Sequence, residues 1–77
     1  MHELQYLTTR HGVWHYLRRV PAEYVHLDPR GNVKLSTKIK VAADRKGVKA
    51  SRVAARLNET VEAYWRGLAG RETAEAR

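Results

Sequence analysis

The stretch Val33–Val41, with the sequence VKLSTKIKV, carries the clearest pattern in the chain. Its odd-numbered positions hold Val, Leu, Thr, Ile and Val, whereas its even-numbered positions hold Lys, Ser, Lys and Lys. Successive side chains of a strand point to opposite faces of the sheet. The stretch is therefore predicted to be a half-buried strand, with a mostly apolar face against the core and a basic face in solvent.

A second strand is predicted over Val13–Val20, which is rich in β-branched and aromatic residues and is stopped by Pro21. Residues 5–10 are expected to form a preceding strand, with His11-Gly12 as the tight turn between the two. The face with the large aromatic side chains is expected to meet the core. It carries Trp14, Tyr16, Arg18 and Val20, whereas the outward face carries Val13, His15, Leu17 and Arg19.

From about Val48 the hydrophobic period becomes that of an α-helix. Apolar residues recur at steps of three and four, at Ala50, Ala54, Leu57, Val61, Tyr64 and Leu68, and the stripe is widened by Val53 and Trp65. Gly70 is the expected C′ residue at the end of this helix. Trp14, Tyr16 and Tyr64 are the expected aromatic core.

The predicted order is β-β-β-α, an α+β fold in which a three-stranded antiparallel sheet packs against one C-terminal helix. Residues 1–70 are expected to form a single small domain, and residues 71–77 a flexible tail or the start of a linker to a further domain. The chain has no cysteine, which excludes disulfides and thiolate zinc sites. Its apolar runs are too short for a transmembrane helix or a signal peptide, so a cytoplasmic location without a membrane partner is expected.

The charge of the chain is unevenly distributed. Fifteen Lys and Arg against eight Asp and Glu give a net charge of +7. Residues 1–56 hold twelve of the basic and four of the acidic side chains, whereas residues 57–77 hold three and four. Such an excess is typical of a nucleic-acid-binding protein. A basic surface that serves solubility alone is the alternative interpretation.

The sequence contains no recognisable catalytic arrangement. Ser36 and Ser51 lack an activating motif, and the five glycines form no phosphate-binding loop. His11 and His15 are four residues apart, but they fall in a turn and a strand without an acidic partner. A non-enzymatic protein with no metal, no cofactor and no small-molecule substrate is therefore predicted.

The basic side chains, in contrast, are organised. The predicted outward faces of the second and third strands combine cations, a hydroxyl group and one apolar side chain, namely His15, Leu17, Arg19, Lys34, Ser36, Lys38 and Lys40. Phosphates are bound by Lys and Arg, and base edges by polar or apolar groups. Lysines that only discourage pairing of an exposed strand are the alternative interpretation.

The start of the predicted helix is basic as well. Arg45, Lys49, Arg52 and Arg56 form one stripe, with Lys46 beside it. Cations at a helix N-terminus oppose the macrodipole, and an external anion bound there would remove the conflict. An ordinary solvated face, with an i, i+4 pair between Glu62 and Arg66, is the alternative.

The stretch Tyr6–Pro21, with the sequence YLTTRHGVWHYLRRVP, resembles the opening of many phage-integrase-type tyrosine recombinases. The segment LSTKIK at 35–40 is similar to the third strand of that N-terminal domain, and the helix with AARLN at 54–58 and Tyr64-Trp65 to its closing helix. The resemblance covers residues 5–69. It implies a sheet whose outer face enters the DNA major groove at arm-type sites, with core-binding and catalytic domains beyond residue 77.

The leading hypothesis is therefore a DNA-binding N-terminal domain of a phage-type integrase that reads double-stranded DNA with its basic sheet face. The expected sheet contacts are His15, Arg19, Lys34, Ser36, Lys38 and Lys40, and the expected phosphate contacts are Arg10, Arg45, Lys46 and Lys49. The alternative is a protein-interaction module that contacts another recombinase protomer, through Leu17 or through Tyr64-Trp65.

Overall fold

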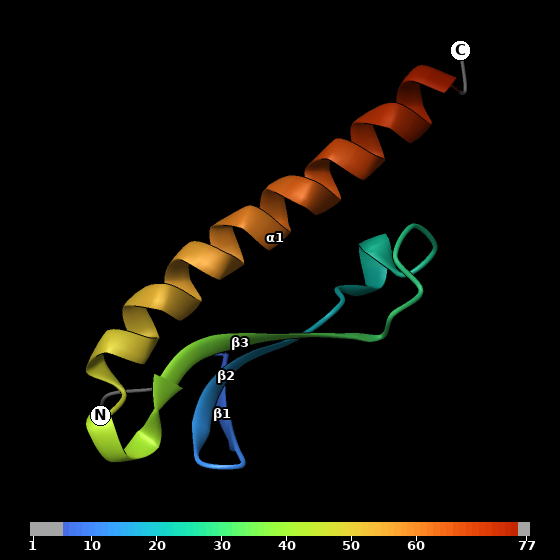
Figure 1. Cartoon of the computed structure of the whole chain (residues 1–77). Coiled ribbons are helices and arrows are strands. Elements are labelled where there is room, and N and C mark those ends of the chain that lie inside the picture. The colour runs from blue at the N-terminus through green and yellow to red at the C-terminus, as the bar shows by residue number, and fades with distance from the viewer. Residues whose placement is uncertain (1–5, 76–77) are drawn as a thin grey trace.

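The computed structural model describes residues 6–75, and its three strands form one antiparallel sheet in the order β1-β2-β3. The strands are β1 (Leu7–Arg10), β2 (Val13–Arg19) and β3 (Asn32–Lys40). One long helix, α1 (Val48–Glu75), covers one face of the sheet, and the short 3-10 turns η1 (Ala22–Tyr24) and η2 (Val41–Ala43) lie in the connections (Figure 1). The predicted β-β-β-α fold is confirmed. Gln5, with which the first strand was expected to begin, lies outside the described residues.

The turn between β1 and β2 is a two-residue hairpin turn, as predicted. Arg10 pairs with Val13, and both residues between them have positive φ, 51° at His11 and 73° at Gly12. Two positive φ angles define a type I′ turn, whose twist matches that of the paired strands. The hairpin turn also meets the segment that follows β3, because Val41 N–H donates to the Gly12 carbonyl at 2.9 Å.

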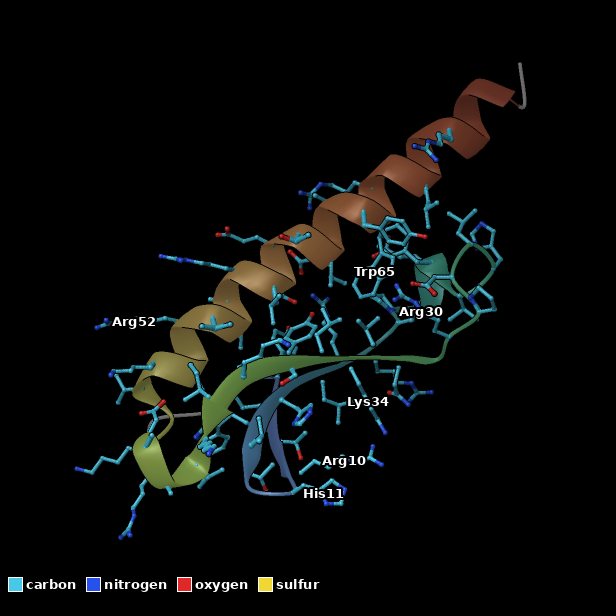
Figure 2. All side chains as sticks on the ribbon, viewed as in Figure 1. Arg10, His11, Arg30, Lys34, Arg52 and Trp65 are labelled. Atoms are coloured by element: carbon cyan, nitrogen blue, oxygen red, sulfur yellow. The ribbon has the colours of Figure 1, made fainter. Side chains whose placement is uncertain are left out.

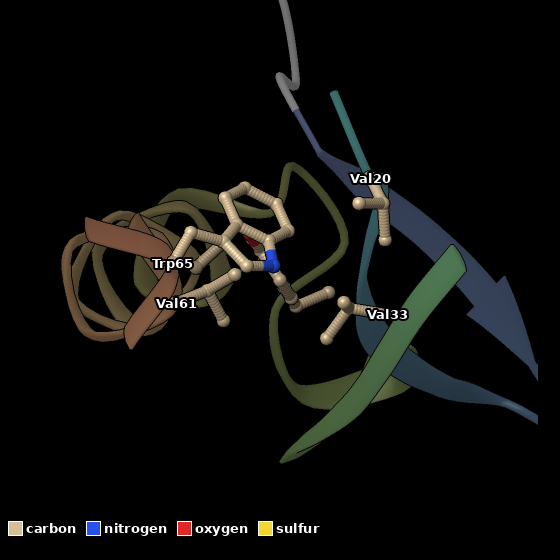
Figure 3. Close-up of a cluster of buried hydrophobic side chains, with 6 residues drawn as sticks. Val20, Val33, Val61 and Trp65 are labelled. Atoms are coloured by element: carbon tan, nitrogen blue, oxygen red, sulfur yellow. The ribbon is translucent and has the colours of Figure 1, made fainter. Parts of the chain in front are cut away.

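The core lies between the sheet and α1. Its buried members are Tyr16, Val20, Val33, Ala54, Val61 and Trp65, and Figure 3 shows the Trp65 indole between α1 and the strands. Trp14 and Tyr16 are buried as predicted, but the prediction for Tyr64 is wrong. Tyr64 is 53% exposed, whereas its neighbour Trp65 is fully buried. The helical periodicity of the apolar residues is compatible with burial of either Tyr64 or Trp65. Trp65 is the buried one because of the contacts that its side chain makes.

Those contacts come from the connection between β2 and β3. The Trp65 ring stacks on Tyr24, with centroids 5.6 Å apart. Its Nε1–H donates to Asp28 Oδ2 at 2.8 Å, and the buried Asp28 carboxylate also accepts from Arg30 Nε at 2.8 Å and Arg30 Nη2 at 2.6 Å. The guanidinium of Arg30 holds the pKa of Asp28 far below its usual range. These contacts hold the connection between β2 and β3, the longest connection of the domain, against α1.

The helix extends beyond Gly70, so the predicted helix end is wrong. Residues 71–75 continue α1, and residues 76 and 77 lie outside the described part of the chain. At 1.5 Å per residue, 28 helical residues span about 42 Å, and the C-terminal part of α1 reaches beyond the sheet (Figure 1). Glycine weakens a helix by only about 1 kcal/mol relative to alanine, which is too little to end one flanked by good helix formers.

Candidate nucleic-acid interface

The face of the sheet that α1 leaves open, hereafter the sheet face, brings residues of all three strands into register. The central row is Thr8, His15 and Ser36, because His15 pairs with both of the others. A second row contains Arg10, Val13 and Lys40, and the remaining outward pairs are Leu17 with Lys34 and Arg19 with Asn32. Figure 2 shows Arg10 and Lys34 on the side of the sheet away from α1.

A shallow hollow of about 430 Å³ lies on the sheet face. Its lining comes from three strands and consists of Thr8, Thr9, Arg10, His15, Leu17, Lys34 and Ser36. Four of the ten predicted contact residues thus meet in one depression. Leu17 adds the apolar contact, and Thr8 and Thr9 are hydroxyl-bearing residues that the sequence analysis did not select. Thr8 pairs with His15 across β1 and β2. Alternation within one strand does not predict which residues of two strands are paired.

The polar groups of this hollow are oriented by the backbone. His15 Nδ1 lies 3.1 Å from the Val13 carbonyl oxygen. A carbonyl oxygen only accepts, so this contact is a hydrogen bond in the tautomer that carries Nδ1–H, and in that tautomer Nε2 is an acceptor. Ser36 Oγ accepts the Lys38 N–H at 3.0 Å, which leaves the Ser36 hydroxyl hydrogen available to a ligand. The hollow therefore offers a donor, an acceptor, cations and an apolar side chain.

Lys38 differs from the other lysines of β3. Ser36 and Lys40 of β3 are four residues apart. Their partners in β2, His15 and Val13, are only two residues apart. Two extra residues therefore form a bulge, and Lys38 within it has φ of 61°. The predicted alternation of exposed and more buried side chains still holds along β3, and only the pairing with β2 is interrupted. Lys38 is exposed, but it has no partner across the sheet and does not line the hollow.

The start of α1 already has an internal anion. The Asp44 carboxylate accepts the Val48 N–H at 3.1 Å and the Ala50 N–H at 2.8 Å. Asp44 also positions the Trp14 side chain, because Trp14 Nε1–H donates to the backbone carbonyl of Asp44 at 2.7 Å. Asp44 thus supplies an internal negative charge at these amides, so the backbone of α1 does not itself require the external anion that the sequence analysis expects there. An Asp four residues before a predicted helix was the sequence signal for this cap.

The remaining predicted phosphate contacts lie outside the hollow. Arg45 and Lys46 are exposed in the turn between η2 and α1, and Lys49 is exposed in the first turn of α1. The bond from Val41 to Gly12 places η2 beside the hairpin turn, next to Arg10 at the end of β1. Arg45 and Lys46 therefore follow a segment that adjoins one end of the sheet face.

Arg18 is a cation of β2 that faces the interior, as the alternation predicts. Its guanidinium lies 4.9 Å from the Tyr6 ring centroid and 5.0 Å from that of Trp65. It donates to Asn58 Oδ1 at 2.6 Å and pairs with Glu62, whose pKa it lowers. Arg18 is thus occupied within the fold and is not part of the sheet face.

The described residues 6–75 contain no group of three or more His, Asp or Glu side chains that could hold a metal ion. Within the same range, α1 is too polar to cross a membrane. No family model matches the chain, and neither a curated protein nor a solved structure matches it.

Proposed function

We propose that this chain binds duplex DNA with its sheet face, as the non-catalytic N-terminal domain of a phage-type integrase. The observation that carries the proposal is the charge of this face. β1, β2 and β3 contain no Asp or Glu. Of their outward cations, Arg10 and Lys34 line the hollow around His15, and Arg19 and Lys40 lie further along β2 and β3 on the same face. A face with cations at its border and polar groups at its centre suits phosphates outside and base edges inside.

The dimensions support major-groove binding. Neighbouring strands lie about 4.8 Å apart, so the axes of three strands span about 10 Å. The major groove of B-DNA is about 12 Å wide. Because α1 covers the opposite face, the sheet face is the sheet surface that a duplex can reach (Figure 1). The integrase assignment itself rests on the resemblance of residues 5–69, and a cytoplasmic location follows from the same proposal.

The alternative of a protein-interaction module loses one of its two expected contacts. Trp65 is fully buried, so the Tyr64-Trp65 pair is not a surface patch. Tyr64 remains exposed, and Arg30 lies 5.7 Å from its ring centroid. The charged sheet face is the better supported surface.

The salt dependence of duplex binding tests the proposal. If four to six phosphates are neutralised, log K falls against log salt with a slope of roughly −4 to −5, measured by fluorescence anisotropy with a random-sequence duplex. The double variant K34Q/K40Q should reduce the slope by about two. A matched control, R66Q/R71Q, removes two exposed cations from the second half of α1 and should leave the slope unchanged. Absence of duplex binding at low salt, or equal effects of the two double variants, would contradict the proposal.

A further inference from the structure

The outer side of α1 carries a second row of cations, hereafter the helix face, made of Lys49, Arg52 and Arg56. The three residues step by three and four along the helix, and all are exposed. Figure 2 shows Arg52 pointing away from the sheet, on the opposite side of the molecule from Lys34. The domain therefore has cations on two opposed surfaces.

The fold does not use the charge of the helix face. None of the three side chains makes a hydrogen bond or an ion pair within residues 6–75, whereas the inward cations Arg18 and Arg30 are both paired with carboxylates. Like charges at i, i+3 and i, i+4 repel, and the exposed Glu59, three residues after Arg56, offsets only part of this repulsion. Lys49 lies in the first turn of α1, where the positive end of the macrodipole also disfavours a cation. The row therefore opposes helix stability and points to a ligand outside the domain.

A duplex on the sheet face would not neutralise this row. The shorter dimensions of the domain are 23 and 19 Å, and the two faces lie on opposite sides of it. The Debye length at physiological salt is about 8 Å, so cations at that distance are largely screened from the first duplex. The helix face remains free to bind a separate polyanion.

The shape of the row favours a nucleic-acid strand over a protein. Lys49 and Arg56 are seven residues apart, which is about 10 Å along the helix axis. A DNA strand carries one charge about every 3.4 Å along its axis, so the row matches about three phosphates. Ala55 and Ala63, which are exposed on the outer side of α1, are too small to anchor a protein partner. The exposed large apolar side chains of α1 are Val48, before the row, and Tyr64, two turns after Arg56.

From these observations we infer that the helix face binds the phosphate backbone of a second duplex, so that one chain bridges two duplexes. This inference rests on the proposed function of the sheet face. With only three cations, the second site has a salt slope of about −2.7 and is occupied at low ionic strength.

A bridging assay tests the inference. The chain is bound to an immobilised random-sequence duplex in about 50 mM salt, and capture of a second, fluorescent duplex is measured. Native mass spectrometry of the same mixture counts chains and duplexes per complex. The wild-type chain should capture the second duplex and give complexes of one chain with two duplexes. R52Q/R56Q should abolish capture while leaving the first duplex bound, and the control R66Q/R71Q should capture as the wild type does.

The outcomes separate the two proposals. Loss of all duplex binding in the wild-type chain contradicts the proposed function and the bridging together. One bound duplex per chain, with no capture of a second, contradicts bridging alone. Capture that survives R52Q/R56Q, or complexes that contain two chains for two duplexes, shows bridging through self-association and also overturns the inference. Within residues 6–75 the side chains of Arg52 and Arg56 make no hydrogen bond or ion pair and repel each other, so the melting temperature of R52Q/R56Q should be no lower than that of the control.

Discussion

Replacement of Asp28 by Asn should remove most of the stability of this domain. Asp28 is 3% exposed, and its Oδ2 accepts from both Trp65 Nε1 and Arg30 Nη2. The amide of Asn keeps only one oxygen. If its NH2 group takes the Oδ2 position, Trp65 Nε1–H and Arg30 Nη2–H lose their acceptor, and if it takes the Oδ1 position, Arg30 Nε–H loses its acceptor. A buried indole N–H without a partner costs about 1–3 kcal/mol. Loss of one partner of a buried ion pair costs up to about 3–5 kcal/mol, but Arg30 is half-exposed and can be rehydrated, which lowers that figure.

The expected loss is therefore about 2–4 kcal/mol at neutral pH. A domain of this size has a free energy of unfolding of only about 3–5 kcal/mol, so Asp28→Asn should be close to unfolding. Urea denaturation followed by tryptophan fluorescence measures the difference. Glu23→Gln is the matched control, since Glu23 is an exposed acid of the same connection and its replacement should change the stability by less than about 0.5 kcal/mol.

The pH dependence of this difference has a definite sign. The pKa of Asp28 is lowered in the folded state by its bonds to Arg30, so its stabilising effect is fully present above the ordinary carboxyl pKa of 3.8. The effect is lost as the pH falls from there toward the lowered folded-state pKa. The gap between wild type and Asp28→Asn should therefore be constant from pH 7 to about 5 and narrow below about 4. A variant as stable as wild type at pH 7, or a gap that does not narrow in acid, would refute this account of the cluster.

Three further predictions concern the turn, the core and the sheet face. Gly12→Ala should destabilise the domain by about 1–2 kcal/mol through the backbone alone, because φ is 73° and no atom lies within 4 Å of the added Cβ; a melting curve checks this. Trp14→Ala should cost about 3–5 kcal/mol and unfold the domain, whereas Tyr64→Ala should cost less than about 1 kcal/mol, as judged by circular dichroism. If Leu17 contacts the methyl group of thymine, binding to poly(dA-dU) should be weaker than to poly(dA-dT) for the wild-type chain, and Leu17→Ala should remove that difference.

The sequence predicts those parts of the fold that depend on local periodicity. Alternation in Val33–Val41 and the step of three and four after Val48 identify β3 and α1, because each pattern has one buried face. Local periodicity does not predict the burial of a side chain when that burial depends on contacts with residues far away in the sequence. Trp65 rather than Tyr64 is buried because Asp28 and Tyr24 lie opposite it, and nothing within the helix specifies that choice.

In the candidate site, too, some features follow from local periodicity and others do not. The outward placement of His15, Lys34 and Ser36 follows from alternation and is found in the structure. The bulge at Lys38 interrupts the pairing of β3 with β2, and no glycine in the sequence marks it. The Asp44 cap lies outside the helix whose charges were considered.

An NMR titration of the 15N-labelled chain with a duplex tests the central claim most directly. At one duplex per chain in low salt, the sheet-face account predicts the largest shifts in the amides of β1, β2 and β3 and in the side-chain signals of His15. Amides of α1 around Tyr64 should change little, since that region lies away from the sheet face. Shifts confined to the region around Tyr64, or a spectrum unchanged by duplex, would contradict the claim that the sheet face binds DNA.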